Sequence, residues 1–442
     1  MLLMCDWLLP RASAVRQLHL NFSNSVGRRG YHFFLLPWRW VKVVAIVARA
    51  ASNLEVLSLE LSGGNGWRAG KPVGSDEQAV LAAQSCHRLK CAVRSCARFK
   101  ELHMRVRQFG GLLLSLLGAL PASLERLVID ASDDTPVGTH RPVNLNRAQE
   151  GGSHLDLACL GALARLVYVH LHLPCLLLRV PAALSCVTFL HLSCKEMTFS
   201  QELAMPDLQH LCLNHHRRDG GSVQLPALHV LTALTALAIT GDLVARDWFT
   251  LPHLRKCDLT DTTLVAQPPA MCTQLESLCI NCQVNCFPVQ FAELVGLRSL
   301  SMPYMCYTHL PPLITQLSNL ETLRLGRVGS VGNLDASALG DLSAFPRLQY
   351  LEFRDCYVAL APCVGTHLPA MLQRLFFFEA LPYATRGGRG VLALHRQLTA
   401  QGRPGVSCIG TSTIMRDPNG RHDRAIWFEH ALDMAATPHA QV

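Results

Sequence analysis

The chain has 442 residues, of which 50% are hydrophobic and 16% are charged, a balance that excludes an extended disordered protein. Its 40 basic and 32 acidic residues leave a net charge of +8, and both signs are mixed along most of the sequence. Such mild positive charge fits solubility better than nucleic-acid binding. We therefore expect no nucleic-acid partner.

The beginning of the chain and its cysteines bear on the cellular compartment. The first residues, MLLMCDWLLPRAS, lack a basic start, and Asp6 interrupts the apolar run, so we expect no signal peptide. The 18 cysteines are scattered rather than clustered in terminal disulfide caps. The apolar stretches 33–48 and 109–122 fall short of the ~20 clean residues that a membrane span needs. These observations predict a cytoplasmic protein without membrane contact, with a cytoskeletal or nuclear location as alternatives.

A hexamer of the form L-x-x-L-x-L recurs along the chain, and residues 297–302 (LRSLSM) show it well. Regular copies begin at Leu208, Leu234, Leu254, Leu275, Leu297, Leu320, Leu348 and Leu372. Weaker copies begin at Val15, Leu54, Phe99, Leu124, Leu166 and Val187. A hexamer of this kind with a period in the twenties predicts an α/β leucine-rich-repeat solenoid, with a curved parallel sheet on the concave face and helices and irregular turns on the convex face.

The hexamers also predict the organisation of the chain. We expect an N-terminal cap over 1–14, a solenoid of about fourteen irregular units over 15–379, and a C-terminal cap over 380–442. Apolar residues at helical spacing predict helices within 41–51, 77–97, 155–165 and 423–436, and 406–409 reads as a last strand. Polar, glycine-rich insertions at 63–74 and 131–152 predict loops. An ordinary α/β protein would instead have long, uniform crossovers and no recurring hexamer.

The hexamers over 15–379 resemble the leucine-rich-repeat superfamily. The opening phrase WLLPRASAVRQLHL, the irregular unit lengths and the scattered cysteines resemble the repeat region of F-box leucine-rich-repeat proteins. That resemblance implies a receptor that holds substrates for a cullin-type ubiquitin ligase. A first hexamer at Val15 leaves no room in this sequence for a preceding F-box of about forty residues. The ligase function is therefore an alternative that rests on the resemblance.

The third, fifth and seventh positions of each unit are predicted to face away from the core, because side chains alternate along a strand. They form three zones along the concave face, with histidines first, then acidic residues, then arginines and aromatics. The predicted partner-binding residues are His170, His191, His210, Asp258, Asp261, Arg324, Arg327, Tyr350, Arg354, Arg374 and Phe376. Arginine and aromatic residues are favoured in interfaces, so we expect a protein partner with an acidic, partly apolar face. A merely solvated surface is the alternative.

Neither a metal site nor catalysis is predicted. His170, His191 and Cys212 share one column, but parallel spacing seldom supplies the tetrahedron that zinc needs, so we expect no metal and no cofactor. No G-x-S-x-G, Walker or H-E-x-x-H motif occurs. The sequence thus predicts a non-enzymatic protein-interaction scaffold that binds a partner on its concave face, with an oligomeric state left open. A ubiquitin-ligase substrate receptor and a cytoskeleton-associated structural protein are the alternatives.

Overall fold

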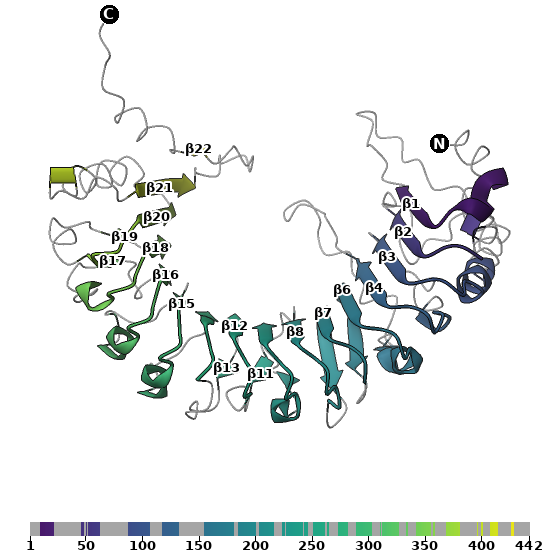
Figure 1. The fold of residues 1–442 in the computed structure, drawn as a ribbon, viewed down its shortest axis with the longest axis horizontal. Helices are drawn as coiled ribbons and strands as arrows, with labels where there is room; N and C mark the ends of the chain where they lie inside the picture. Colours follow the sequence, from purple (N-terminus) through teal and green to yellow (C-terminus); the bar gives the residue numbers. More distant parts are fainter. Residues whose placement is uncertain are drawn as a thin grey trace, which may run out of the picture. The chain divides into compact units, whose positions relative to one another are not determined.

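The structure is a computed structural model that forms two compact units, Met1–Leu234 and Thr235–Val442. It describes residues 9–21, 46–47, 50, 52–61, 87–106, 117–131, 154–180, 184–199, 203–215, 223–225, 227–241, 243–245, 251–260, 263–264, 273–281, 289–302, 310, 312–326, 333–334, 342–354, 357–358, 368–380, 396, 399–400, 407–413 and 426–427. The loops predicted within 63–74 and 132–152 lie outside these residues. Each unit is a parallel β-solenoid (Figure 1).

In the first unit, every hexamer becomes a strand that begins at its third position. The strands are β1 (Gln17–Asn21), β2 (Val56–Leu61), β3 (Glu101–Val106), β4 (Arg126–Asp130), β6 (Tyr168–Val180), β7 (Phe189–Phe199) and β8 (His210–His215). They pair in parallel in this order, with equivalent repeat positions in register. The short β5 (His154–Asp156) pairs with the second half of β6, and β9 (Val223–Gln224) follows β8.

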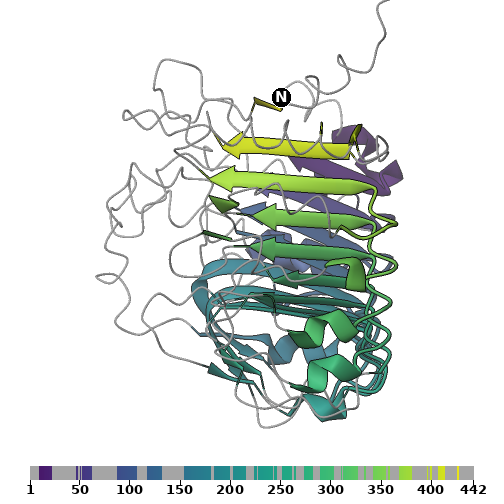
Figure 2. The same cartoon turned by 90° about the vertical axis from the view of Figure 1, so that its left-hand side faces the viewer.

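The second unit repeats the pattern with more uniform strands. They are β10 (Ala236–Thr240), β12 (Lys256–Thr260), β14 (Ser277–Asn281), β15 (Ser299–Met302), β16 (Thr322–Gly326), β18 (Tyr350–Arg354), β20 (Arg374–Ala380) and β21 (Ser407–Thr413). They also pair in parallel and in register, one after another (Figure 2). Smaller parallel pairs join β11 (Leu243–Ala245) to β13 (Thr263–Leu264) and β17 (Asn333–Leu334) to β19 (Tyr357–Val358).

The core of each unit consists of the first, fourth and sixth positions of the hexamers. In the fourth hexamer of the second unit, Leu297, Leu300 and Met302 are at most 3% exposed. Because alternate residues point to opposite sides of a strand, the intervening Ser299 and Ser301 remain partly exposed. Each fully buried leucine contributes roughly 1.5–3 kcal/mol, so the repeated leucines supply the main stabilising term. The predicted parallel solenoid and its inward leucines are confirmed.

The segments that return from one strand to the next differ from the expectation of helices. The described return segments hold mainly 3₁₀ helices: η1 (Leu9–Ala14), η3 (Leu157–Ala162), η4 (Leu228–Val230), η6 (Val289–Glu293), η7 (Pro312–Gln316) and η9 (Leu342–Ala344). Over 155–165, the predicted helix is instead the end of β5 followed by η3, whereas residues 87–94 are α-helical. A repeat of about 22 residues leaves room for one tight turn after its strand, which favours 3₁₀ geometry. Little α-helix is therefore present in the described residues.

The C-terminal region also departs from the expectation in part. The last strand predicted at 406–409 is present as β21, which continues to Thr413. Within the amphipathic helix predicted over 423–436, the described residues form β22 (Ile426–Trp427), which pairs antiparallel with β21. The helix prediction is wrong at these two residues, because β21 offers a strand edge that backbone hydrogen bonds can extend.

A hydrogen-bonding pattern at the entry of each strand sets the register. The carbonyl of Arg298, at the second position of its hexamer, accepts the N–H groups of Glu321 at 2.8 Å and Thr322 at 2.9 Å. Equivalent paired bonds join hexamers throughout both units, for example from Glu125 and Arg126 to the carbonyl of Lys100. Within a unit, each hexamer is thereby held in register with the next one where its strand begins.

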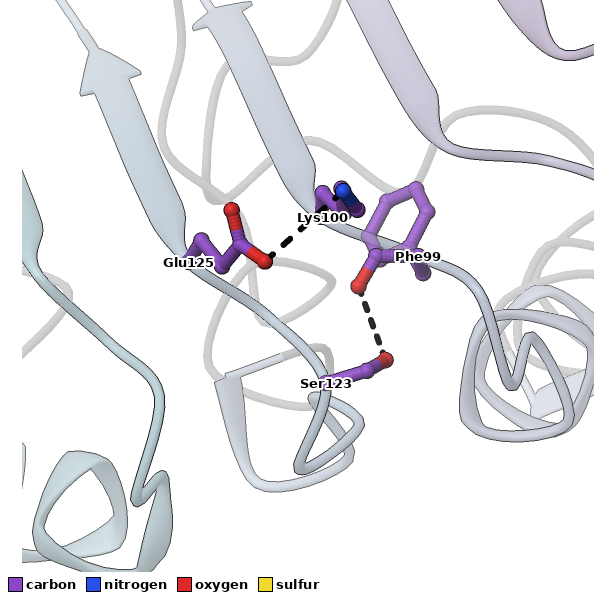
Figure 3. A network of polar contacts seen from close by, with 4 residues as sticks. All are labelled: Phe99, Lys100, Ser123 and Glu125. Carbon is purple, nitrogen blue, oxygen red and sulfur yellow. Dashed lines mark hydrogen bonds and ion pairs between the residues drawn. The ribbon is translucent and has the colours of Figure 1, made fainter.

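Side chains at the same entry positions reinforce this register in places (Figure 3). Lys100 Nζ lies 4.0 Å from Glu125 Oε1, and Ser123 Oγ donates a 2.8 Å hydrogen bond to the carbonyl of Phe99. The second unit has the same alternation of charge in the pairs Arg255–Glu276 and Arg298–Glu321, at 3.8 and 3.6 Å. These exposed pairs are each worth less than about 1 kcal/mol, so they favour one register rather than supply the stability.

Candidate partner-binding surfaces

The third, fifth and seventh positions of the hexamers form one side of each sheet, here called the open face. It corresponds to the predicted concave face. In the first unit its third-position row runs through Arg126, Tyr168, Phe189 and His210 on β4, β6, β7 and β8, which are in direct register. Their side chains form a continuous stack, here called the aromatic row.

The contacts within the aromatic row are close. The guanidinium carbon of Arg126 lies 4.1 Å from the centre of the Tyr168 ring. Tyr168 and Phe189 stack in parallel, with ring centres 4.3 Å apart and an interplanar angle of 5°. His210 follows at 5.8 Å from Phe189. Parallel-strand register brings successive rings to about 4.8 Å before any side-chain adjustment, which is close to ideal stacking distance.

The fifth-position row of the first unit contains the predicted histidine pair. His170 and His191 meet edge to face, with ring centres 4.2 Å apart. The pKa of His191 is lowered to about 4, mainly by burial and to a smaller extent by its neighbours His170 and His172. The His170 pKa is lowered mainly by burial, although nearby Asp130 opposes this. Both rings are therefore neutral at pH 7.

Polar neighbours fix the orientation of these rings. Asn214 Nδ2 lies 3.2 Å from His191 Nε2, so the amide can donate to the neutral imidazole. His172 Nδ1 lies 2.7 Å from Ser193 Oγ. The amide therefore occupies one of the two ring nitrogens through which His191 could bind a metal.

The described residues contain no group of three or more His, Cys, Asp or Glu side chains placed to hold a metal ion. His170, His191 and Cys212 are adjacent in register, but the two rings pack against each other rather than toward a common point. Cys212 lies 3.9 Å from Asn214 Oδ1. This geometry suits a packed polar surface, not a tetrahedral centre.

In the second unit, the arginine-rich zone is built around a buried carboxylate. Glu352, at the fifth position of the hexamer that forms β18, has a side chain only 2% exposed. It accepts a 2.9 Å hydrogen bond from the hydroxyl of Tyr350, and Arg324 Nε lies 3.2 Å away. The Arg324 guanidinium also lies over the Tyr350 ring, 5.6 Å from its centre. Arg324 is therefore largely neutralised by Glu352, although its side chain is 45% exposed.

Two predicted residues extend this zone onto β20. Arg374 is in register with Tyr350, and Phe376 is in register with Glu352. Arg374 is exposed and Phe376 is partly exposed. The structure therefore brings Arg324, Tyr350, Arg374 and Phe376 together on three adjacent strands, and we call them, with Glu352, the arginine cluster. Arg327 lies outside the described residues, and Arg354 is described only as the last residue of β18.

The predicted acidic zone is reduced to one described residue. Asp258 is exposed on β12 and accepts a 2.8 Å hydrogen bond from the Thr260 hydroxyl, while Asp261 lies outside the described residues. Asp258 is in register with Cys279. The pKa of the Cys279 thiol is raised to about 11, mainly by burial and to a smaller extent by Asp258. The thiol is therefore protonated at neutral pH.

Four residues of these surfaces were not among the predicted binding residues. Arg126, Tyr168 and Phe189 belong to the aromatic row, and Glu352 anchors the arginine cluster. The signal that could have revealed them is the alignment of hexamers, since residues at equal positions in successive hexamers become neighbours. The neighbour relationship of Arg126 and Tyr168 was not evident from the sequence, because their hexamers begin 42 residues apart, with a long insertion between them.

The repeat, its inward leucines and its parallel register define the class of this protein as a leucine-rich-repeat solenoid. No family model matches the chain, and no curated protein matches it. The chain is similar to solved structures of that class. One is a leucine-rich-repeat protein of Leptospira interrogans, at 15% identity and a TM-score of 0.48 over 89% of this chain and 97% of the other.

Two further similar structures come from a bacterium and a plant. An internalin of Listeria monocytogenes shares 13% identity over 79% of this chain and 84% of its own, with a TM-score of 0.41. The ectodomain of the receptor kinase GASSHO1/SCHENGEN3 of Arabidopsis thaliana, solved with CASPARIAN STRIP INTEGRITY FACTOR 2, shares 15% over 84% of this chain and 45% of its own, with a TM-score of 0.39. The assignment of the fold here rests on the repeat itself. Among the described residues, no helix is long and apolar enough to span a bilayer.

Proposed function

We propose that this protein is a non-enzymatic interaction scaffold that binds a partner protein through the open face of its sheet. The observation that carries the proposal is the arginine cluster, in which Arg374 and Phe376 flank the Arg324–Glu352 pair on adjacent strands. Arginine and aromatic side chains are enriched in interface centres because they desolvate a large area at a small entropic cost. A rigid sheet holds them in place before binding.

The chemistry of the cluster favours a partner with an acidic, partly apolar face. Glu352 largely compensates Arg324, so Arg374 is the cation that would meet an acidic group, while Phe376 and Tyr350 supply apolar contact. The Arg324–Glu352 pair would act mainly by holding the Tyr350 ring, through the Tyr350 hydroxyl and the Arg324 guanidinium. Such an arrangement gives specificity through charge and shape rather than through a pocket.

The test is affinity purification with the full chain and two variants. Arg374→Glu should lose most of the partners recovered by the natural protein, because it places a carboxylate against an acidic face. Arg347→Glu, an exposed arginine that directly precedes the first leucine of the β18 hexamer, is the matched control and should retain them. Equal recovery by Arg374→Glu and the natural chain would show that the cluster is not the binding surface.

A substrate receptor of a cullin-type ubiquitin ligase is the second candidate, and it rests only on the resemblance of the repeat region to F-box leucine-rich-repeat proteins. It uses the same open face to hold a substrate. Co-purification of a cullin and its adaptor with the full chain would favour it. A cytoskeletal structural role remains the third candidate, and co-sedimentation with actin filaments or microtubules tests it.

A further inference from the structure

We propose that the aromatic row of the first unit, together with the adjacent histidines, is a second docking surface, and that its partner is an extended, acidic peptide segment. The row lies in the first compact unit, on residues that the arginine cluster does not use. The proposal is therefore independent of the function proposed above and can fail separately from it.

The exposed chemistry of the aromatic row follows from its stacking. One face of Tyr168 is covered by Arg126 and the other by Phe189, so only the edge of the ring and its hydroxyl remain for a partner. Ring edges carry partial positive charge, because the π-electrons concentrate on the faces. The row thus presents positive ring edges, a hydroxyl donor and the guanidinium of Arg126. Each of these groups attracts a carboxylate.

Charge on the surrounding surface supports this choice. The third, fifth and seventh positions of β6, β7 and β8 include no acidic residue. The nearest acidic groups on β2 and β4 are occupied, because Glu60 and Asp130 lie 3.9 and 3.6 Å from Arg105. Arg105 on β3 is therefore compensated by carboxylates, whereas Arg126 on β4 borders β6, whose open face carries no acidic residue.

Arg126, on β4, lies between the strands whose open face carries acidic residues and those whose open face carries none. Glu101 is its register neighbour on β3, but the Glu101 carboxylate lies 3.1 Å from His103 Nε2. Among the described residues, no ion pair involves Arg126, and its buried Nε has no hydrogen-bond partner. The Arg126 side chain as a whole is partly exposed, so its two terminal nitrogens are the groups that would bind a carboxylate.

The dimensions of the row indicate the shape of its partner. Four adjacent strands span about 14 Å, which an extended segment of about four residues covers. Successive side chains of an extended segment point to opposite sides, so the side chains that meet the row come from every second residue. A segment in which every second residue is acidic therefore turns its carboxylates toward Arg126 and the imidazoles.

The histidines make this binding sensitive to pH. His170 is faced by Asp130 and Arg126 from β4, by His172 from its own strand and by His191 from β7, and burial lowers its pKa. Carboxylates of a bound segment would oppose that lowering and raise the pKa. By linkage, a complex that binds protons more readily than the free protein is strengthened as the pH falls. Affinity should therefore rise as the pH falls from 7.5 to 6.0.

The experiment uses the full chain and a fluorescein-labelled peptide of alternating glutamate and leucine, measured by fluorescence anisotropy. A matched peptide of lysine and leucine and a ten-nucleotide single-stranded RNA are the comparison ligands. We expect the acidic peptide to bind at least about tenfold more tightly than the lysine peptide. Its affinity should rise at least about threefold between pH 7.5 and 6.0 and fall with added salt.

Single substitutions test whether the peptide binds at the aromatic row. Arg126→Glu should weaken binding of the acidic peptide about tenfold or more. Arg165→Glu, an exposed arginine between strands, should leave binding unchanged. Phe189→Leu preserves apolar volume but breaks the stack, and it should weaken binding while thermal unfolding shows that the variant folds. Equal binding of both peptides, tighter binding of the RNA, or full binding by folded Arg126→Glu would overturn the proposal.

Discussion

Arg324 Nε lies 3.2 Å from Glu352 Oε2, across neighbouring strands whose hexamers begin 28 residues apart. The two partners differ sharply in exposure, since the Arg324 side chain is 45% exposed and that of Glu352 only 2%. The pair therefore joins a solvated cation to a buried anion. This asymmetry makes the two residues unequal contributors to stability.

Arg324→Ala should destabilise the protein more than Glu352→Gln. Removing the guanidinium takes away the charge that neutralises a buried carboxylate, at a cost of about 3 kcal/mol. Replacing the carboxylate by an amide retains an acceptor for the Tyr350 hydroxyl and leaves a solvated arginine, at a cost of about 1 kcal/mol. Urea unfolding of both variants measures the difference. Equal losses would show that the carboxylate is not effectively buried.

Gly296→Ala should destabilise the second unit. A Cβ atom at this residue would lie 2.9 Å from the carbonyl oxygen of Thr273, a backbone atom that cannot move away alone. The expected loss is about 1–3 kcal/mol. His253→Ala is the control, because His253 is exposed and also directly precedes the first leucine of a hexamer. If the urea midpoints of the two variants coincide, the close contact at Gly296 does not affect the stability of the protein.

Lowering the pH should destabilise the first unit because of His191. Its pKa is about 4 in the folded protein and about 6.5 in the unfolded chain, so the unfolded chain binds more protons between these values. Stability is full above about pH 6.5 and falls toward pH 4, by about 1–2 kcal/mol because solvent screens a ring that is only partly buried. In His191→Gln this part of the dependence should disappear. Urea midpoints from pH 7.5 to 4.5 in both proteins provide the measurement, and parallel curves would contradict the assignment.

Native alkylation should discriminate among the cysteines. Burial raises the pKa of Cys194 to about 12 and that of Cys96 to about 11, whereas Cys91 is exposed. At pH 8 only about one Cys194 in 10,000 would be a thiolate, the form that reacts. Brief treatment with iodoacetamide should therefore modify Cys91 and spare the other two, as mass spectrometry of peptides can show. Unfolding in urea should make all three reactive, and rapid native labelling of Cys194 would contradict its burial.

Most of the fold was predictable from the hexamer, because the alternation of inward and outward residues is local. Leu297, Leu300 and Met302 are buried where the pattern places them, and the strands begin at the third position of each hexamer. The helices expected between strands were less predictable. Apolar spacing over 155–165 suits a helix, but β5 and η3 occupy it because β6 offers backbone groups to pair with. A tertiary partner thus overrode a local preference.

For the candidate sites, the sequence predicted which residues lie on the same face of the sheet, but not which of them contact one another. The sequence by itself determined which residues share the open face, including His170, His191, Arg324 and Arg374, because a strand has a period of two. Only the tertiary structure decided that Arg126 stacks on Tyr168 and that Glu352 is buried beneath Arg324. Such contacts depend on which strands are neighbours after long insertions and on side-chain rotamers. Neither of these is encoded by the spacing of leucines within one hexamer.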